Sequence, residues 1–430
     1  MEGLKTFKSE PITFTRVTKS FIIDAKKESV MRFGEWSGSA MGGLIGGFLG
    51  GAVGCGVGAF IGKIIATQFI DDGKEEAKRL AKEAVSEEEI NRLRQSAELD
   101  DPTAMNSLGI RCLGGAGVPL DYKEAARWFA RAAQAGHSDA MYNLACRYFF
   151  GEGIPEDKEE AVRWFLQAAK LGHAKAMVNL GVCYANGEGV SQDLTQAVER
   201  WRQAAELGVA EARFNLGVCY EKGEGVLQDL TQAVEWWRQA ADAGDASAMF
   251  ALGVCYMTGE GVSQDKTQAT VWWRKAADAG NASAMFNLGV RYENGRGVSQ
   301  DWTQAVAWYR KAADAGDASA MFNLGVCYAK GEGVSQDWTQ AVVWYRQAAN
   351  AGDASAMFNL GVCYENGRGV SQDYAEAKHL YEACLAQNDN VALPYAARAL
   401  ARLYREGLGV EKDDATADEY ERLADEFERR

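Results

Sequence analysis

The sequence predicts an all-α protein: a right-handed α-solenoid of nine helix–turn–helix repeats, preceded by a glycine-rich hydrophobic helix. Two observations carry this prediction. A Leu-Gly step recurs every 36 residues through most of the 430-residue chain, and an uncharged stretch near the N-terminus has a glycine at every fourth position. Fixed periods of this length are typical of repeat proteins, whose helical hairpins bury their apolar faces only by stacking on their neighbours.

The repeat is marked most clearly by its leucines. Eight of them are 36 residues apart, and the ninth follows after 40, so the last unit has an insertion: Leu108, Leu144, Leu180, Leu216, Leu252, Leu288, Leu324, Leu360 and Leu400. We therefore assign residues 101–430 to the repeats, 74–100 to a linker with capping helices, 36–66 to the hydrophobic segment and 1–35 to a tail of unknown structure.

The unit at residues 245–280 illustrates the first helix of a repeat. Its apolar stripe includes Leu252, which is followed by a glycine in the middle of the predicted helix, Gly253. A glycine there costs about 1 kcal/mol relative to alanine, so we expect a close approach of another helix in compensation. Gly259 and Gly261 end the helix, because glycine adopts positive φ without steric strain.

The second helix of the same unit begins after Asp265, and every other unit has an aspartate at this position. A short side-chain acceptor directly before a helix is the pattern of an N-cap, which stabilises a helix by about 1 kcal/mol. Ala269 and Trp273 then place a small and a large side chain one turn apart, as interlocking helices require. Gly280 ends the helix.

These motifs resemble a known family. The Leu-Gly-x-x-Tyr step, the Gly-x-Gly-Val loop, the capping aspartate and the Ala-x-x-Trp-aromatic run are similar to Sel-one-like repeats, a branch of the tetratricopeptide superfamily, over about residues 101–430. The resemblance implies a right-handed superhelix and an adaptor role, often in bacteria, without naming a partner. One branch of the family pairs two cysteines within each repeat, and this chain departs from that pattern.

The cysteines in the repeats recur one per unit and are therefore too far apart for disulfides, since stacked helices lie about 8–10 Å apart. They are expected to be small buried thiols in a reducing compartment: Cys183, Cys219, Cys255, Cys327 and Cys363. At the ends of the array, Ser86 and Glu89 form a capping-box pattern that opens a helix covering the first repeat, and the charged residues 425–430 suit an exposed last helix.

Residues 36–62 contain no charge, and a glycine stands at every fourth position: Gly42, Gly46, Gly50, Gly54, Gly58 and Gly62. In water such a helix is disfavoured, whereas in lipid small residues at this spacing allow close helix packing. The pattern resembles glycine-zipper membrane segments. We expect a membrane-associated helix that can form a homo-oligomer; a re-entrant hairpin or pore, and a glycine-rich loop or buried soluble helix, are the alternatives.

We expect the chain to have no catalytic activity and to bind no nucleic acid. Its net charge of −14 disfavours nucleic acid, and three histidines, two of them at equivalent helix-opening positions (His137 and His173), provide no metal-ligand spacing. The Gly-x-Gly-Val loops lack the lysine and hydroxyl of a phosphate-binding loop. We therefore predict no catalytic residue, no cofactor and no metal, and a protein that is not an enzyme.

Candidate partner-binding residues lie on the first helices, which form the concave side of a solenoid. An asparagine precedes most of the repeat leucines, and three arginines replace the recurring cysteine: Asn143, Asn179, Asn215, Asn287, Asn323, Asn359, Arg111, Arg147 and Arg291. A structural inter-helix hydrogen bond is the alternative role for the asparagines. Trp302 and Trp338 follow the caps and would be exposed anchors unless they pack.

The sequence thus favours a protein-interaction scaffold, associated with a membrane through its N-terminal segment and with its repeats in the cytoplasm, which binds unknown protein partners on the concave surface. One alternative is a membrane-active, pore-forming or toxin-like glycine-zipper protein with a repeat targeting domain. The other is a soluble, cytoplasmic regulatory or immunity-type repeat scaffold.

Overall fold

A computed structural model describes residues 77, 79–81, 86–387 and 392–429. These residues are helical apart from short connections, and none of them lies in a β-strand. They fall into two compact units: the first extends to Leu288 and includes Arg296–Val298, and the second comprises Gly289–Gly295 and the residues from Ser299 onward. The two units are described separately.

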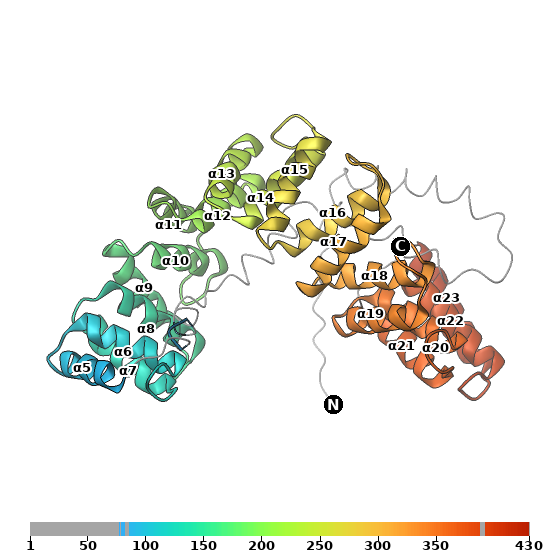
Figure 1. The fold of residues 1–430 in the computed structure, drawn as a ribbon, viewed down its shortest axis with the longest axis horizontal. Helices are drawn as coiled ribbons and strands as arrows, with labels where there is room; N and C mark the ends of the chain where they lie inside the picture. The colour runs from blue at the N-terminus through green and yellow to red at the C-terminus, as the bar shows by residue number, and fades with distance from the viewer. Residues whose placement is uncertain (1–76, 78, 82–85, 388–391, 430) are drawn as a thin grey trace, which may run out of the picture. The chain divides into compact units, whose positions relative to one another are not determined.

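The helices follow one another at the predicted period (Figure 1). The first unit contains α5 (Glu87–Glu98), α6 (Pro102–Gly114), α7 (Tyr122–Gln134), α8 (Ser138–Phe150), α9 (Lys158–Lys170), α10 (Ala174–Asn186), α11 (Leu194–Glu206), α12 (Ala210–Lys222), α13 (Leu230–Asp242), α14 (Ala246–Thr258) and α15 (Lys266–Asp278). Residues of both units form α16 (Ala282–Asn294), and the second unit continues with α17 (Trp302–Asp314), α18 (Ala318–Lys330), α19 (Trp338–Asn350), α20 (Ala354–Asn366), α21 (Tyr374–Leu385), α22 (Leu393–Glu406) and α23 (Asp414–Arg429).

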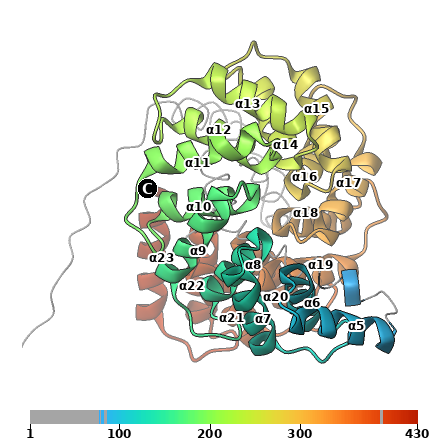
Figure 2. The same ribbon diagram turned by 90° about the vertical axis from the view of Figure 1, so that its left-hand side faces the viewer.

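Helix pairs are the packing unit in both parts. In the first unit α6 packs on α7, α8 on α9, α10 on α11, α12 on α13 and α14 on α15 (Figure 2). The second helices α7, α9, α11 and α13 also contact the first helix of the next pair. The second unit repeats this order from α18 to α23. The predicted all-α helical repeat is therefore confirmed. Its right-handed sense and the domain boundaries drawn from the sequence stay predictions.

The helix ends follow the predicted signals. Asp265 Oδ1 accepts hydrogen bonds from the backbone N–H groups of Thr267 and Gln268, at 2.9 and 3.0 Å, and the other capping aspartates from Asp121 to Asp413 make equivalent bonds. Gly259 ends α14 in the left-handed region with φ of 85°. Each turn thereby satisfies backbone groups that a helix end leaves unpaired.

Where a first helix has a glycine in its middle, that glycine lies against an aromatic ring of the second helix. A Cβ atom on Gly253 would come within 2.3 Å of Trp273 Cδ1, and one on Gly217 within 2.4 Å of Trp237 Nε1. Both tryptophans are fully buried. The close approach expected from the sequence is therefore confirmed, and it brings the helix backbone into direct contact with the ring.

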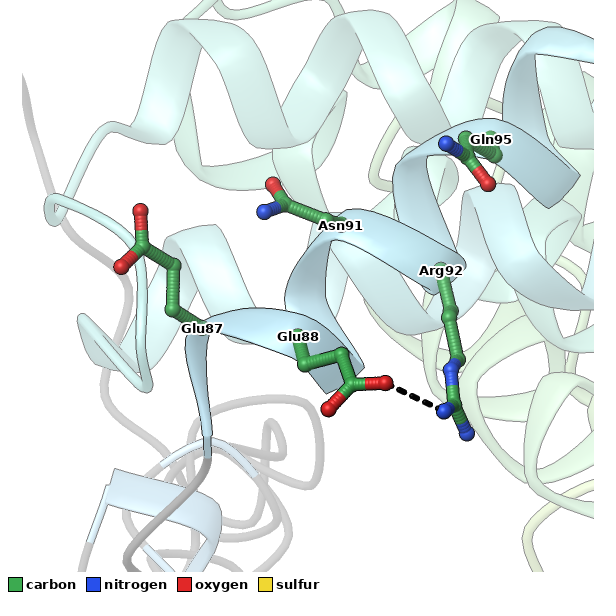
Figure 3. A pocket seen from close by; sticks show the side chains of 5 residues that line it. All are labelled: Glu87, Glu88, Asn91, Arg92 and Gln95. Atoms are coloured by element: carbon green, nitrogen blue, oxygen red, sulfur yellow. Dashed lines mark hydrogen bonds and ion pairs between the residues drawn. The ribbon is translucent and has the colours of Figure 1, made fainter.

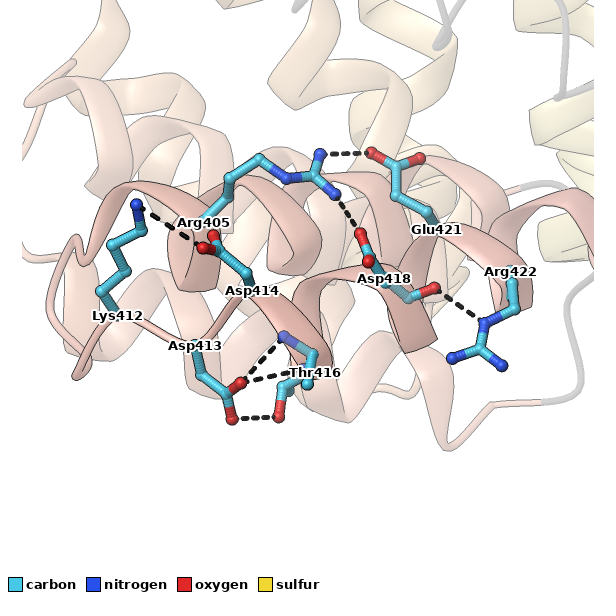
Figure 4. A network of polar contacts seen from close by, with 9 residues as sticks. Arg405, Lys412, Asp413, Asp414, Thr416, Asp418, Glu421 and Arg422 are labelled. Atoms are coloured by element: carbon cyan, nitrogen blue, oxygen red, sulfur yellow. Dashed lines mark hydrogen bonds and ion pairs between the residues drawn. The ribbon is translucent and has the colours of Figure 1, made fainter.

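The two ends of the array differ in how they meet solvent. At the start, α5 packs on α6 through Ile90 and Ala97, and its N-cap Ser86 accepts a hydrogen bond from the N–H of Glu89. At the end, α22 and α23 are joined by exposed ion pairs: Arg405 contacts Asp418 at 2.9 Å and Glu421 at 3.2 Å (Figure 4). Exposed pairs of this kind contribute about 0–1 kcal/mol each, so they favour solubility of the last helix more than its stability.

The glycine-zipper segment predicted at residues 36–66, with Gly42, Gly46, Gly50, Gly54, Gly58 and Gly62, lies outside the described residues. The tail at 1–35 also lies outside them. None of the helices in the described part of the chain combines the length and the apolar character needed to cross a bilayer.

Candidate partner-binding surface

The groups that most often carry chemistry have structural roles here. The cysteines of the described residues are buried, and burial raises the pKa of the Cys219 and Cys255 thiols to about 12, far from the thiolate form. His137 and His173 cap α8 and α10 by accepting a hydrogen bond at Nδ1. No group of three or more potential metal ligands occurs among the residues that the structure describes.

Two surface depressions lie near the start of the array. One is lined by polar residues of α5 alone, where Glu88 and Arg92 form an exposed ion pair at 2.5 Å (Figure 3). The other lies between α5, α6 and α7, and its lining includes Arg94, Cys112 and Trp128. Neither combines an enclosed apolar wall with convergent polar groups, which is the usual character of a small-molecule site.

The asparagines predicted to bind a partner are buried on the first helices. Asn179 and Asn215 are each 1% exposed, and Asn143, Asn323 and Asn359 are 5–6% exposed; Asn287 is half-buried. The amide of Asn143 donates to Oδ1 of Asn106 at 3.1 Å, a bond between adjacent repeats. This bond supports the structural alternative for Asn143. Asn106 was not predicted from the sequence, because it stands one residue before the position that is equivalent to Asn143 in the first repeat.

Three of the other asparagines have side-chain atoms without a hydrogen bond. Both amide atoms of Asn179, and the amide oxygens of Asn215 and Asn359, have no hydrogen-bond partner within the described residues. A buried amide without a partner costs about 1–3 kcal/mol. The partner-binding role of these asparagines stays a prediction.

The three arginines are buried or nearly so. The side chain of Arg147 is 3% exposed and pairs with Glu152 at 2.7 Å, while that of Arg111 is 11% exposed and lies 3.4 Å from Glu89. Arg291 is 6% exposed. Their guanidinium groups therefore lie inside the fold and not on an open surface, and their role in binding a partner stays a prediction.

The aromatic residues after the caps, Trp302 and Trp338, are half-buried. The guanidinium of Arg368, in the loop of the following repeat, stacks 5.1 Å from the centre of the Trp338 ring. Trp338 thus forms part of a contact between repeats, which the sequence left open.

A second set of inter-repeat contacts was not anticipated. On several second helices an arginine donates to the tyrosine hydroxyl on the next first helix, as Arg202 does to Tyr220 at 2.9 Å and Arg238 to Tyr256 at 3.2 Å. Arg310 and Tyr328 repeat the arrangement in the second unit. Both residue types recur every 36 positions, so the signal was present in the sequence, although nothing there shows that the two rows meet.

The aromatic ring behind a first helix can make one of two polar contacts, except in the first two repeats, where it is Phe129 or Phe165. Where it is tryptophan, the indole N–H donates to a backbone carbonyl of the first helix, as Trp237 does to Phe214 at 3.2 Å. Where it is tyrosine, the hydroxyl can reach a side chain near the end of that helix, and Tyr381 donates to Glu365 at 2.7 Å. The choice of ring therefore decides whether a neighbouring glutamate has a donor.

A stack of helical hairpins that recur at a fixed period defines a helical repeat protein. The Sel1 repeat model matches residues 102–137, 138–173, 174–209, 210–245, 246–281, 282–317, 318–353, 354–389 and 394–419, and the chain belongs to the Sel1-repeat family. Among curated proteins, none matches the chain significantly.

One solved structure supports the same fold, and a second is similar in sequence. A Sel1 repeat protein from Oxalobacter formigenes is 29% identical, with a TM-score of 0.58 and coverage of 74% of this chain and 92% of that one. A protective antigen of uropathogenic Escherichia coli strains, with an SLR fold, is also 29% identical; the match covers 80% of this chain and 91% of that one at a TM-score of 0.49.

Proposed function

We propose that the protein is an interaction scaffold whose first helices bind segments of protein partners. The observation that carries the proposal is repetition on one set of helices: half-buried tyrosines recur at the same position of α10, α12 and α14 as Tyr184, Tyr220 and Tyr256. A surface that repeats at the period of the fold suits an extended partner segment better than a single small molecule. Asn179 and Asn215, on two of the same helices, have unpartnered amide oxygens, which supports a polar contribution to binding.

Site-specific photo-crosslinking tests this proposal. The full chain would carry benzoylphenylalanine at Tyr256, on the first helix α14, or at Val271, which is 42% exposed on the second helix α15 of the same repeat. Crosslinks to a partner in the native cells are expected from position 256 and not from 271. Equal yields from both positions, or none from 256, would contradict binding on the first helices.

We propose further that residues 36–66 attach this scaffold to a membrane, with the repeats in the cytoplasm. The support is the absence of charge from 36 to 62 together with the four-residue glycine spacing. Introducing charge inside the segment, by Gly50→Asp with Gly54→Asp, is expected to release the full chain from the membrane fraction. Gly34→Asp with Gly73→Asp, outside the segment, is the matched control.

A wild-type chain that stays soluble after lysis, or that leaves the membrane in carbonate, would favour the soluble regulatory scaffold instead. Leakage of dye from liposomes caused by the full chain, and lost in the Gly50→Asp/Gly54→Asp variant, would favour the pore-forming alternative.

A further inference from the structure

Three first helices have a glutamate five residues after the repeat leucine, at a position that is apolar in the other repeats except the last, which has Arg405. These glutamates are Glu221 on α12, Glu293 on α16 and Glu365 on α20, and the equivalent residue of α14 is Met257. The carboxylates differ in what surrounds them, although their positions in the repeat are the same.

Glu365 shows how the fold satisfies such a carboxylate. The residue is only 6% exposed. Tyr381 donates its hydroxyl to Oε2 at 2.7 Å, and the guanidinium of Arg402, from the first helix of the next repeat, pairs with Oε1. The side chain of Arg402 is itself 51% exposed, so the guanidinium reaches the carboxylate from the solvent side.

Glu293 retains one of these two partners. The Tyr309 hydroxyl donates to it, while the residue in the position of Arg402, two after the next repeat leucine, is Val326. Burial raises the pKa of Glu293, and the hydrogen bond from Tyr309 acts in the opposite direction. A single neutral donor therefore compensates only part of the cost of burying the charge.

Glu221 has neither partner. The ring behind it is Trp237, whose indole N–H already donates to Phe214, and the residue in the position of Arg402 is Val254. Oε2 of Glu221 is buried and has no hydrogen-bond partner in the part of the chain that the structure describes. A buried carboxylate oxygen without a donor is costly, and a charged donor satisfies it best.

The charged groups around Glu221 do not supply a donor to its carboxylate. Burial raises the pKa of the Glu221 carboxyl to about 7; the charge of Lys222 lowers it, and those of Glu260 and Glu224 raise it again. Lys222 lies 3.9 Å from Glu224, with which it forms an ion pair. The surroundings of Glu221 are therefore net acidic.

We propose that Glu221 is the recognition site for an arginine side chain of a protein partner, which would occupy the place that Arg402 occupies beside Glu365. The Glu365 site shows that the repeat can accommodate this contact, because there the guanidinium of Arg402 reaches the carboxylate from the solvent side. The net charge of −14 favours a basic partner segment. This inference rests on the proposed function, since it assigns one contact within the partner-binding surface.

Selection from a random library of 12-residue peptides tests the site on the full chain, with the wild type and Glu221→Gln compared in parallel. Wild type is expected to enrich peptides with arginine at one fixed position, and a selected peptide should bind Glu221→Gln about tenfold or more weakly. Replacing that arginine with citrulline, which removes the charge at similar shape, should weaken binding to wild type by a similar factor.

An internal ligand gives a second test. Val254→Arg places a guanidinium where Arg402 stands in the last repeat, and it should abolish binding of the selected peptide, whereas the matched control Val254→Met should bind within about twofold of wild type. Circular dichroism of each variant separates a blocked site from a misfolded chain, since the blocked variant keeps the wild-type helical signal.

The outcomes separate this inference from the proposed function. Enriched peptides without a fixed arginine, or with equal affinity for wild type and Glu221→Gln, would overturn the role of Glu221 and leave the scaffold function standing. Failure to enrich any peptide on wild type would overturn both.

Discussion

At the scale of single residues, the helical hairpins depend on the contact between a glycine backbone and an aromatic ring. Alanine has the higher helix propensity by about 1 kcal/mol, so glycine in the middle of α12 is unfavourable for the isolated helix. In the folded chain a Cβ on Gly217 would lie 2.4 Å from Trp237 Nε1, well inside van der Waals contact. Tertiary packing therefore outweighs helix propensity at this position.

We predict that Gly217→Ala destabilises the protein by about 1–3 kcal/mol, because the added methyl group overpacks against a fully buried ring. Urea denaturation followed by circular dichroism measures the change. A variant as stable as wild type would show that the ring can move aside at little cost.

The chain contains its own control for this substitution. The second repeat has Ala145 in place of the glycine, and the ring behind it is Phe165, both fully buried. Adding Trp237→Phe to Gly217→Ala should therefore recover part of the lost stability, giving a coupling energy of about 1 kcal/mol in a double-mutant cycle. Additive losses would mean that the two side chains do not compete for the same space.

A second residue-scale prediction concerns the buried carboxylate of Glu221. Its pKa in the folded state, about 7, is above the ordinary value of 4.5, so the folded chain binds this proton more tightly than the unfolded chain. The resulting loss of stability is absent below about pH 4.5, grows as the pH rises toward 7, and is complete above it.

Glu221→Gln should remove that loss and therefore stabilise the protein at pH 8 but not at pH 4. Because the group is partly exposed, solvent screening reduces the full effect of the shift, and we expect about 1–2 kcal/mol. Thermal unfolding of both proteins at the two pH values measures the difference. An identical difference at pH 4 and pH 8 would exclude a titrating carboxyl as its cause.

At the scale of the helix, the N-caps set where each element begins, and two first helices, α12 and α22, lack a side-chain cap. His173 and Asp245 accept backbone hydrogen bonds at the start of α10 and α14, and Asn281 does the same for α16, with Oδ1 2.8 Å from the N–H of Ala284. The equivalent residue of α12 is Val209, which makes no side-chain cap. The backbone of Val209 is extended, as a capping residue requires.

Val209→Asn is therefore predicted to stabilise the protein by about 0.5–1 kcal/mol, and asparagine avoids burying a new charge. Chemical denaturation measures the gain. Val209→Ala is the matched control and should not stabilise, since it removes the valine side chain without adding an acceptor; a gain as large from alanine would contradict capping as the mechanism.

The helices, their ends and the glycine–ring contact could be predicted because each is encoded within one repeat, as the Asp265 cap and the Gly253–Trp273 pair illustrate. The environment of the candidate binding residues could not be predicted from the sequence. Burial of Asn179 and Arg147 depends on side chains brought close only by folding, and the pairing of Glu365 with Arg402 joins two repeats. The sequence showed which positions recur, and only the structure shows which of the recurring rows touch.

At the scale of the whole molecule, stability should be the sum of the repeats and of the contacts between neighbours. Two successive second helices of the second unit are nearly identical: α17 reads WTQAVAWYRKAAD and α19 reads WTQAVVWYRQAAN. Removing residues 318–353, a complete repeat, would bring α20 after α17 in place of α19, and Asp317 would replace Asp353 as its N-cap.

We predict that the chain lacking 318–353 folds with the same helical signal per residue as wild type and unfolds with a smaller m-value, in proportion to the surface it no longer buries. Deleting only residues 318–335 is the decisive comparison, because it removes α18 and leaves two second helices in succession.

The buried residues of α18, Phe322 and Leu324 among them, would then have no substitute, and α17 and α19 would each expose the face that packs on α18. The shorter deletion should therefore destabilise the protein more, with lost helicity and a broadened urea transition. Equal destabilisation by both deletions would mean that stability depends on particular long-range contacts and not on the repeat as a unit.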